Sequence, residues 1–308
     1  MGSRLTYVLA MEIKLLAFDS FGVRSMATWV STKDVRVMID PGVALAPRRY
    51  GLPPHPLEFN RLRECGETVA EYAGDSDLII VTHYHYDHHD LGDLIPLEVY
   101  RGKEVYVKHP EENINPSQKF ERAPLFLGKI RNLPRKLGYA DNNQLTIGKT
   151  TIRFSRAVPH GSDPKLGYVV EVSISDGETK LVYTSDVEGP VLEEQAKFVL
   201  EEKPNILIVD GPMTYMLGYR YSLENLESAL RNLKEIITKT PVETLILEHH
   251  FMRDLNYKII AGPVYKAANS RKVKVLTAAE YAGRKIEMLE AIRPELYKKF
   301  KPEGRKEE

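Results

Sequence analysis

The sequence predicts an α/β protein with four layers, in which two sheets pack face to face and helices cover the outer side of each sheet. Short apolar runs typical of strands alternate with segments of helical spacing along the 308 residues. The chain also divides into two strand-rich halves, and each half ends in helices. Two such halves bury their apolar faces when their sheets pair, which gives an α/β-β/α sandwich.

The first half reads as short strands around one helix. We predict strands and helices in chain order as follows: strands at 12–19, 26–32 and 35–40, a helix at 56–73, a strand at 77–82, a short helix after Asp90 and a strand at 104–108.

Residues 110–143 are the least regular stretch, rich in charge and interrupted by Pro116, Pro124 and Pro134. We expect a partly helical insertion that acts as a lid over the site, with a solvated excursion as the alternative. The whole chain to residue 300 is expected to form one domain, and residues 301–308 a charged tail. The sequence assigns no role to residues 1–10.

The second half repeats the pattern of strands followed by helices. We predict the strands at 144–147, 150–158, 167–174, 179–185, 205–210, 243–247 and 273–276, and the helices near 191–202, at 222–239 and at 278–299. The helix at 222–239 carries a one-sided row of apolar residues, as expected for a helix that packs on a sheet.

Composition argues against a membrane partner and weakens, without excluding, a nucleic-acid partner. Lys and Arg total 43, as do Asp and Glu, so no overall field attracts nucleic acid or an anionic membrane. No apolar run approaches the roughly 20 residues that cross a bilayer, and we expect no membrane partner. With Cys65 as the only cysteine, an intrachain disulfide is impossible and a cytoplasmic location is expected.

A cluster of histidines follows the apolar strand at 77–82. It reads His83-Tyr-His85-Tyr-Asp87-His88. Side chains alternate along a strand, so His83 and His85 project the same way, and a turn would bring Asp87 and His88 back beside them. Two adjacent pockets of nitrogen and oxygen donors suit zinc or a similar divalent metal. The alternative, a polar loop with several histidines, requires spacing and strand context to coincide by chance.

This segment resembles the H-x-H-x-D-H signature of the metallo-β-lactamase superfamily. Four further motifs that end or follow strands match that family in order; they contain Asp40, His160, Asp186 and the pair His249-His250. The resemblance spans about residues 13 to 280, and the chain is most similar to a mainly archaeal branch. It implies the metallo-β-lactamase fold.

The resemblance also implies a two-metal hydrolase. Its first site would contain His83, His85 and His160, and its second site Asp87, His88 and His249, with Asp186 bridging. Asp87 and Asp186 would serve catalysis, in which a hydroxide shared by the metals attacks an ester-like or phosphodiester bond. Two zinc ions are expected, with manganese or iron as alternatives.

Several neighbouring residues are assigned supporting roles. Strand alternation favours His249 over His250 as the last ligand and turns His250 toward substrate. Asp40 is expected to accept a hydrogen bond from a ligand histidine. Anionic substrate groups could be met by Arg48, Arg49 or Arg253, for which the alternative is an ordinary salt bridge.

The substrate class stays open between two readings of the same site. We expect a small or phosphorylated molecule, because the chain lacks the extra nucleic-acid-binding insertions of the family's nucleases; a ribonuclease-type phosphodiesterase acting on RNA is the alternative. A non-hydrolytic metal or redox protein of the same fold is a third reading. It is disfavoured because His85 stands where flavodiiron relatives usually carry Glu, and no ligand of the motif is missing. The sequence does not determine the oligomeric state.

Overall fold

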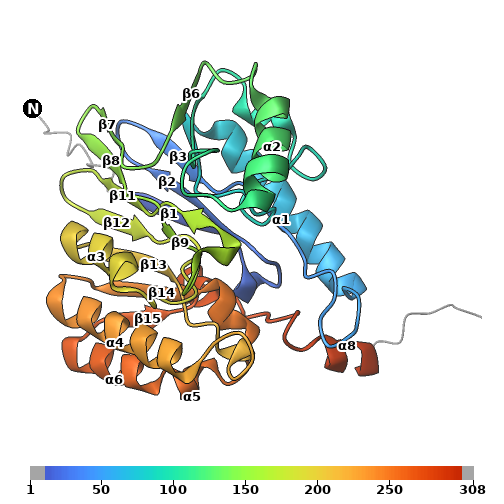
Figure 1. The fold of residues 1–308 in the computed structure, drawn as a ribbon, viewed down its shortest axis with the longest axis vertical. Helices are drawn as coiled ribbons and strands as arrows, with labels where there is room; N and C mark the ends of the chain where they lie inside the picture. Colours follow the sequence, from blue (N-terminus) through green and yellow to red (C-terminus); the bar gives the residue numbers. More distant parts are fainter. Residues whose placement is uncertain (1–10, 300–308) are drawn as a thin grey trace, which may run out of the picture.

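Two mixed sheets pack against each other, and helices cover the outer face of both (Figure 1). The computed structural model describes residues 11–299, so residues 1–10 and the predicted tail at 301–308 lie outside the described residues. The arrangement confirms the predicted α/β sandwich. Among residues 11–299, no helix is long and apolar enough to cross a membrane.

The first sheet has six strands in the order of the chain. They are β1 (Glu12–Phe18), β2 (Met26–Ser31), β3 (Arg36–Ile39), β4 (Leu78–Val81), β5 (Glu104–Val107) and β6 (Lys136–Tyr139). The first three strands are antiparallel, whereas β3 to β6 run parallel. The carboxyl ends of β3, β4 and β5 therefore meet at one edge of the sheet.

The second sheet has seven strands in the order β15-β14-β13-β12-β11-β8-β7. Its members in chain order are β7 (Gln144–Ile147), β8 (Thr150–Phe154), β11 (Val172–Ser175), β12 (Lys180–Tyr183), β13 (Ile206–Asp210), β14 (Thr244–Glu248) and β15 (Lys274–Leu276). Strands β12 to β15 are parallel, so their carboxyl ends also share one edge. A separate pair, β9 (Val158–Pro159) and β10 (Tyr168–Val169), lies near that edge.

Helices cover the two outer faces. The first sheet carries α1 (Pro56–Asp75) and α2 (Ala123–Ile130), and the second carries α3 (Glu193–Glu202), α4 (Leu223–Lys239), α5 (Tyr257–Ile260) and α6 (Gly262–Arg271) (Figure 1). Cys65, Val69 and Ala73 are buried at a spacing of four residues, which places one face of α1 on the sheet. The helix begins at a capping box between His55 and Glu58.

The main apolar core lies between the sheets and extends under α1. All four residues of β4 are buried there. Burial of each Leu, Ile or Val side chain contributes roughly 1.5–3 kcal/mol, so this strand is held firmly in place. The loop that carries the predicted metal motif therefore leaves a rigid strand.

Two predicted helices are wrong. After Asp90 the chain forms a turn, in which Asp90 Oδ1 accepts the N–H groups of Gly92 and Asp93, and Pro96 delays a short 3₁₀ helix to Leu97–Tyr100. The predicted helix at 278–299 is two short helices, α7 (Ala278–Tyr281) and α8 (Arg293–Lys299). Between them the chain turns at Gly283, which has a φ of 64°, and crosses to the segment that follows β1, where the N–H of Glu287 donates to the Ser20 carbonyl.

Residues 110–143 contain helical and extended parts. The π-helix η3 (Gln118–Arg122) continues into α2, and β6 then pairs with β5 as the edge strand of the first sheet. The end of this segment thus belongs to the sheet rather than to an excursion.

Candidate metal centre

The predicted metal-binding residues all leave the carboxyl ends of strands. The histidine motif follows β4, His160 follows β9, Asp186 follows β12, and His249 follows β14 directly. Near the ends of three strands, β3, β12 and β14, a non-glycine residue has a positive φ: Asp40 at 52°, Ser185 at 57° and His249 at 56°. Such strained turns direct the chain out of the sheet and concentrate at functional sites.

The side chains converge into two groups that share one carboxylate. The first group is His83, His85, His160 and Asp186; the second is Asp87, His88, Asp186 and His249. Within each group the donor atoms all lie within 4.8 Å of one another. Seven residues from two halves of the chain therefore present nitrogen and oxygen atoms to two adjacent points.

Asp186 is the centre of this arrangement. Its Oδ2 lies 3.2 Å from Nε2 of both His160 and His249, and its Oδ1 lies 3.0 Å from His88 Nε2. One carboxylate thus contacts rings of both groups, which is the geometry that a bridging position requires.

Buried carboxylates hold the outer nitrogens of two rings. Asp40 Oδ2 lies 2.8 Å from Nδ1 of His88, and Asp19 Oδ2 lies 2.8 Å from Nδ1 of His249. Asp40 also accepts hydrogen bonds from Thr82 and Tyr183. In both cases the outer nitrogen faces a carboxylate, which orients the ring with Nε2 toward the group.

The electrostatic environment differs among the histidines of the two groups. Burial lowers the pKa of His83 well below its usual range and that of His85 to about 3, so both rings are neutral. Burial also opposes a charge on His88, but Asp186 and Asp40 outweigh it and raise the pKa of His88 to about 10. For Asp186, burial alone would raise the pKa, yet His249 and His88 hold it well below its usual range.

One nitrogen of the first group, His83 Nε2, is buried without a hydrogen-bond partner among residues 11–299. A buried polar atom without a partner costs about 1–3 kcal/mol unless another ligand satisfies it. Imidazole nitrogens and carboxylate oxygens suit zinc and similar divalent ions, so the residues present fit the metals that the sequence implies.

The two candidate last ligands occupy different positions. His249 belongs to the second group, whereas His250 Nδ1 lies 3.0 Å from Asp210 Oδ2. Strand alternation predicts that the two rings point to opposite sides. The structure differs, since the ring centres are only 4.6 Å apart. The strand ends at Glu248, and the positive φ of His249 turns the pair together.

A cavity of about 940 Å³ opens onto both groups. Asp87, His160 and Asp186 line it, together with His250. Five cationic side chains also line it: Arg24, Arg122, Lys165, Arg220 and Arg253.

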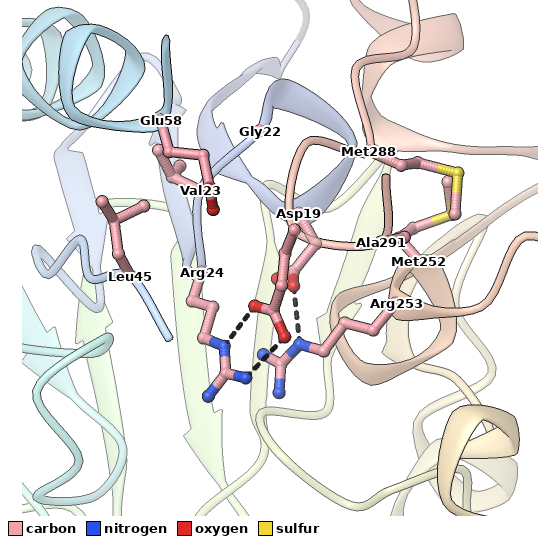
Figure 2. A pocket seen from close by; sticks show the side chains of 11 residues that line it. Asp19, Gly22, Val23, Arg24, Leu45, Glu58, Met252, Arg253, Met288 and Ala291 are labelled. Carbon is pink, nitrogen blue, oxygen red and sulfur yellow. Dashed lines mark hydrogen bonds and ion pairs between the residues drawn. The ribbon is translucent and has the colours of Figure 1, made fainter. Parts of the chain in front are cut away.

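Of the three arginines that the sequence suggests as contacts for anionic substrate groups, only one lines the cavity. Arg48 is exposed and donates to the Gly51 carbonyl, and Arg49 stacks on Tyr215; neither lines the cavity. Arg253 does line it, but it is buried and donates to Asp19. Figure 2 shows Arg253, Asp19 and Arg24 beside a water-sized pocket of about 10 Å³ next to the centre.

Sequence reasoning missed several residues of the site. Asp19 and Asp210 stand at or directly after the ends of β1 and β13, which is the same signal that identified Asp40, and both could have been found by it. Arg122 and Arg220 lie outside strands and carry no such signal.

Comparisons with known proteins agree with this arrangement. The family model of the beta-lactamase superfamily domain matches residues 35–250. A UPF0282 protein of Metallosphaera sedula is 50% identical over 287 residues, which cover 93% of each chain. A UPF0282 protein of Sulfurisphaera tokodaii is 47% identical over 94% of each chain.

A solved structure shows the same fold at low sequence identity. The metallo-beta-lactamase fold protein YhfI of Bacillus subtilis covers 87% of this chain and 95% of its own, with a TM-score of 0.51 and 18% identity. At this identity the likeness concerns the fold alone.

Proposed function

The chain belongs to the metallo-β-lactamase superfamily, and its relatives there include UPF0282 proteins; on this basis we propose that it is a two-metal hydrolase of ester-like or phosphodiester bonds. The single observation that carries this proposal is the position of Asp186. Its carboxylate contacts His160 and His249 through one oxygen and His88 through the other, at the floor of an open cavity. A purely structural metal site is closed, whereas a catalytic one keeps an open side.

The proposed metals are two zinc ions, with manganese or iron as alternatives. His83, His85 and His160 would hold one, Asp87, His88 and His249 would hold the other, and Asp186 would contact both. When bound, such ions lower the pKa of water toward about 7 and polarise an electrophilic oxygen. The donor set of imidazoles and carboxylates is the chemistry that these ions prefer.

The protein's own residues divide the remaining tasks. Asp87 lines the cavity, and although burial alone would raise its pKa, His88 and His249 hold it below its usual range. An ionised carboxylate facing the cavity can accept a hydrogen bond from an attacking water and so orient it. Asp40 and Asp19 fix the rings of His88 and His249, so the donor atoms are preorganised.

The cavity supports a small substrate rather than a long polymer. Its volume of about 940 Å³ lies in the range that accommodates small ligands and cofactors. We therefore propose a small or phosphorylated molecule as the substrate, with RNA as the alternative.

Metal analysis combined with a substrate screen tests the proposal. Purified protein is expected to contain about two metal equivalents and to hydrolyse p-nitrophenyl esters or bis(p-nitrophenyl) phosphate. Asp186→Ala should lose metal and reduce turnover by at least about 100-fold. Asp93→Ala is the control, because Asp93 is exposed, belongs to neither group and does not line the cavity.

Three outcomes would contradict the proposal. Full metal content and normal turnover in Asp186→Ala would show that this carboxylate does not hold the centre together. Bound iron without hydrolysis of any substrate would favour the redox alternative. Cleavage of RNA far faster than of any small ester would favour the ribonuclease alternative.

A further inference from the structure

Three of the five cationic side chains that line the cavity are neutralised by carboxylates. Arg24 donates to Glu290 through Nε and Nη2, at 2.6 and 2.7 Å. Arg253 Nε donates to Asp19 over 2.7 Å, and Lys165 Nζ lies 3.0 Å from Asp163. Figure 2 shows the contact between Arg253 and Asp19, with Arg24 beside them. Their guanidinium charges are largely compensated before any ligand arrives.

The other two, Arg122 and Arg220, form no ion pair with any residue between 11 and 299. Each instead lies beside a tyrosine ring. The guanidinium carbon of Arg122 is 5.0 Å from the ring centre of Tyr86, and that of Arg220 is 5.7 Å from the ring centre of Tyr219. Stacking of this kind orients a guanidinium group while leaving the N–H groups at its edge free.

Arg122 is tied to the metal loop by its surroundings. Tyr86 lies between His85 and Asp87 in that loop. Arg122 closes the π-helix η3, which begins at Gln118; the Gln118 amide lies 3.4 Å from His85 Nε2 and donates to the Leu166 carbonyl over 2.8 Å. π-Helical turns are rare and often occur at functional sites. This one fixes Arg122 beside the first metal group.

Arg220 approaches the same cavity from a distant part of the chain. It lies between the 3₁₀ helix η5 (Thr214–Met216) and α4, and its side chain is exposed. A single unpaired arginine on a surface is ordinary. Two arginines from segments about 100 residues apart that line one cavity, both without a carboxylate, create a local positive field in a chain of zero net charge.

We propose that Arg122 and Arg220 together bind a phosphate group of a small phosphorylated substrate. The guanidinium fork matches two phosphate oxygens, and a phosphate has enough acceptor oxygens for two such forks. This inference rests on the proposed function, in which the scissile bond lies against the metal groups. It adds that the two arginines select the substrate by its phosphate.

Binding of inorganic phosphate to the purified, metal-containing protein tests the inference without requiring turnover. Isothermal titration calorimetry is carried out on the wild type and on Arg122→Gln, Arg220→Gln and the double variant, after their metal content has been measured. Each single change should weaken phosphate binding about tenfold, because a hydrogen bond to a charged group is lost. Arg48→Gln is the matched control, since Arg48 is an exposed arginine outside the cavity, and it should bind as the wild type does.

Several outcomes decide the question. If both arginine variants bind phosphate as tightly as Arg48→Gln, the inference is overturned. Arg122→Lys keeps the charge but loses the fork, so an intermediate loss supports fork recognition. Exposed Arg220 can be changed without disturbing the core, so its variant remains informative even if Arg122→Gln does not fold. A single-stranded RNA that binds far more tightly than phosphate, and depends on both arginines, would overturn the small-molecule assignment.

The same data separate the two proposals. Arginine-dependent phosphate binding without hydrolysis of any ester upholds the inference and rejects the proposed function. Hydrolysis of an ester, combined with phosphate binding that is unchanged in both arginine variants, supports the proposed function and rejects the inference.

Discussion

Asp19 and His249 lie 230 positions apart in the chain, yet Asp19 Oδ2 is 2.8 Å from His249 Nδ1. The second oxygen of Asp19 accepts a hydrogen bond from Arg253. Both acceptor positions of the carboxylate are therefore used, and His249 is held with Nε2 3.2 Å from Asp186. The start of the first sheet thus orients a donor that the end of the second sheet supplies.

Replacing Asp19 with Asn should weaken the second metal group. The side-chain oxygen of Asn can accept the hydrogen bond from His249 only if the NH₂ group of the same amide faces Arg253. Because Arg253 is itself a donor, two donors would then face each other. Loss of such an outer contact typically costs 10–100-fold in metal affinity, and we expect a loss of about this size. Competition against a chromogenic chelator measures it. Asp163→Asn serves as the control, and an unchanged affinity in Asp19→Asn would show that the contact does not orient the ring.

The paired histidines should separate metal binding from turnover. His249→Ala removes a member of the second group and should reduce the metal content by about one equivalent. His250→Ala should keep the metal, because its ring contacts Asp210, and should alter KM or kcat through the cavity that it lines. Metal analysis and steady-state kinetics of the two variants check this. The opposite pattern of metal loss would assign the ligand to His250.

Glu290 should make stability depend on acidic pH. Burial alone would raise its pKa, but Arg24 lowers it to about 2, below the ordinary value of 4.5. Because the pKa of Glu290 is depressed in the folded protein, its ion pair stabilises the fold fully at pH values above 4.5. This stabilisation is lost as the pH falls from 4.5 to about 2. Glu290→Gln should therefore be less stable than the wild type by on the order of 3 kcal/mol near neutral pH.

Urea unfolding across that pH range measures the effect. The difference between wild type and Glu290→Gln should shrink toward zero as the solution is acidified. Glu98→Gln is the control, because Glu98 forms only an exposed pair with Arg101 and should differ from wild type by about 0–1 kcal/mol. A difference that stays constant down to about pH 2 would contradict the depressed pKa.

Cys65 should be unreactive in the folded protein. The thiol is buried under α1, and burial raises its pKa to about 11. Because the thiolate is the reactive form, Ellman's reagent at about pH 8 should modify the folded protein at least about 100-fold more slowly than the unfolded chain. The same protein in concentrated guanidinium chloride provides the reference rate. Rapid stoichiometric labelling of native protein would show that the helix does not cover the thiol.

The parts of the fold that could be predicted depend on local pattern. The strand β4 and the histidine motif after it are adjacent in sequence, so alternation and a turn were enough to group His83 with His85. The failed helix at 278–299 shows the limit of local spacing. Its middle is held instead by a backbone bond from Glu287 to Ser20 and by the pairing of Glu290 with Arg24. Both contacts are with the segment between β1 and β2 and have no local sequence signal.

The same limit explains the arginines. Arg48 follows the Asp40 loop in sequence and was expected at the site, but the chain turns it to solvent. Arg122 reaches the cavity because η3 packs against His85, and Arg220 because the loop before α4 returns there. Which charged side chain faces a cavity is decided by how distant segments pack, and a single sequence contains no direct record of that.

The division of the metal donors between the two halves has a consequence for biosynthesis. The loop at residues 83–88 leaves the ribosome first, but each group also needs a residue that is made later, Asp186 for both and His249 for the second. Neither group can be completed on a partial chain, because the two sheets must already have met. If the chain binds the pair of ions proposed above, they would be loaded together only after His249 has been made and the two sheets have met.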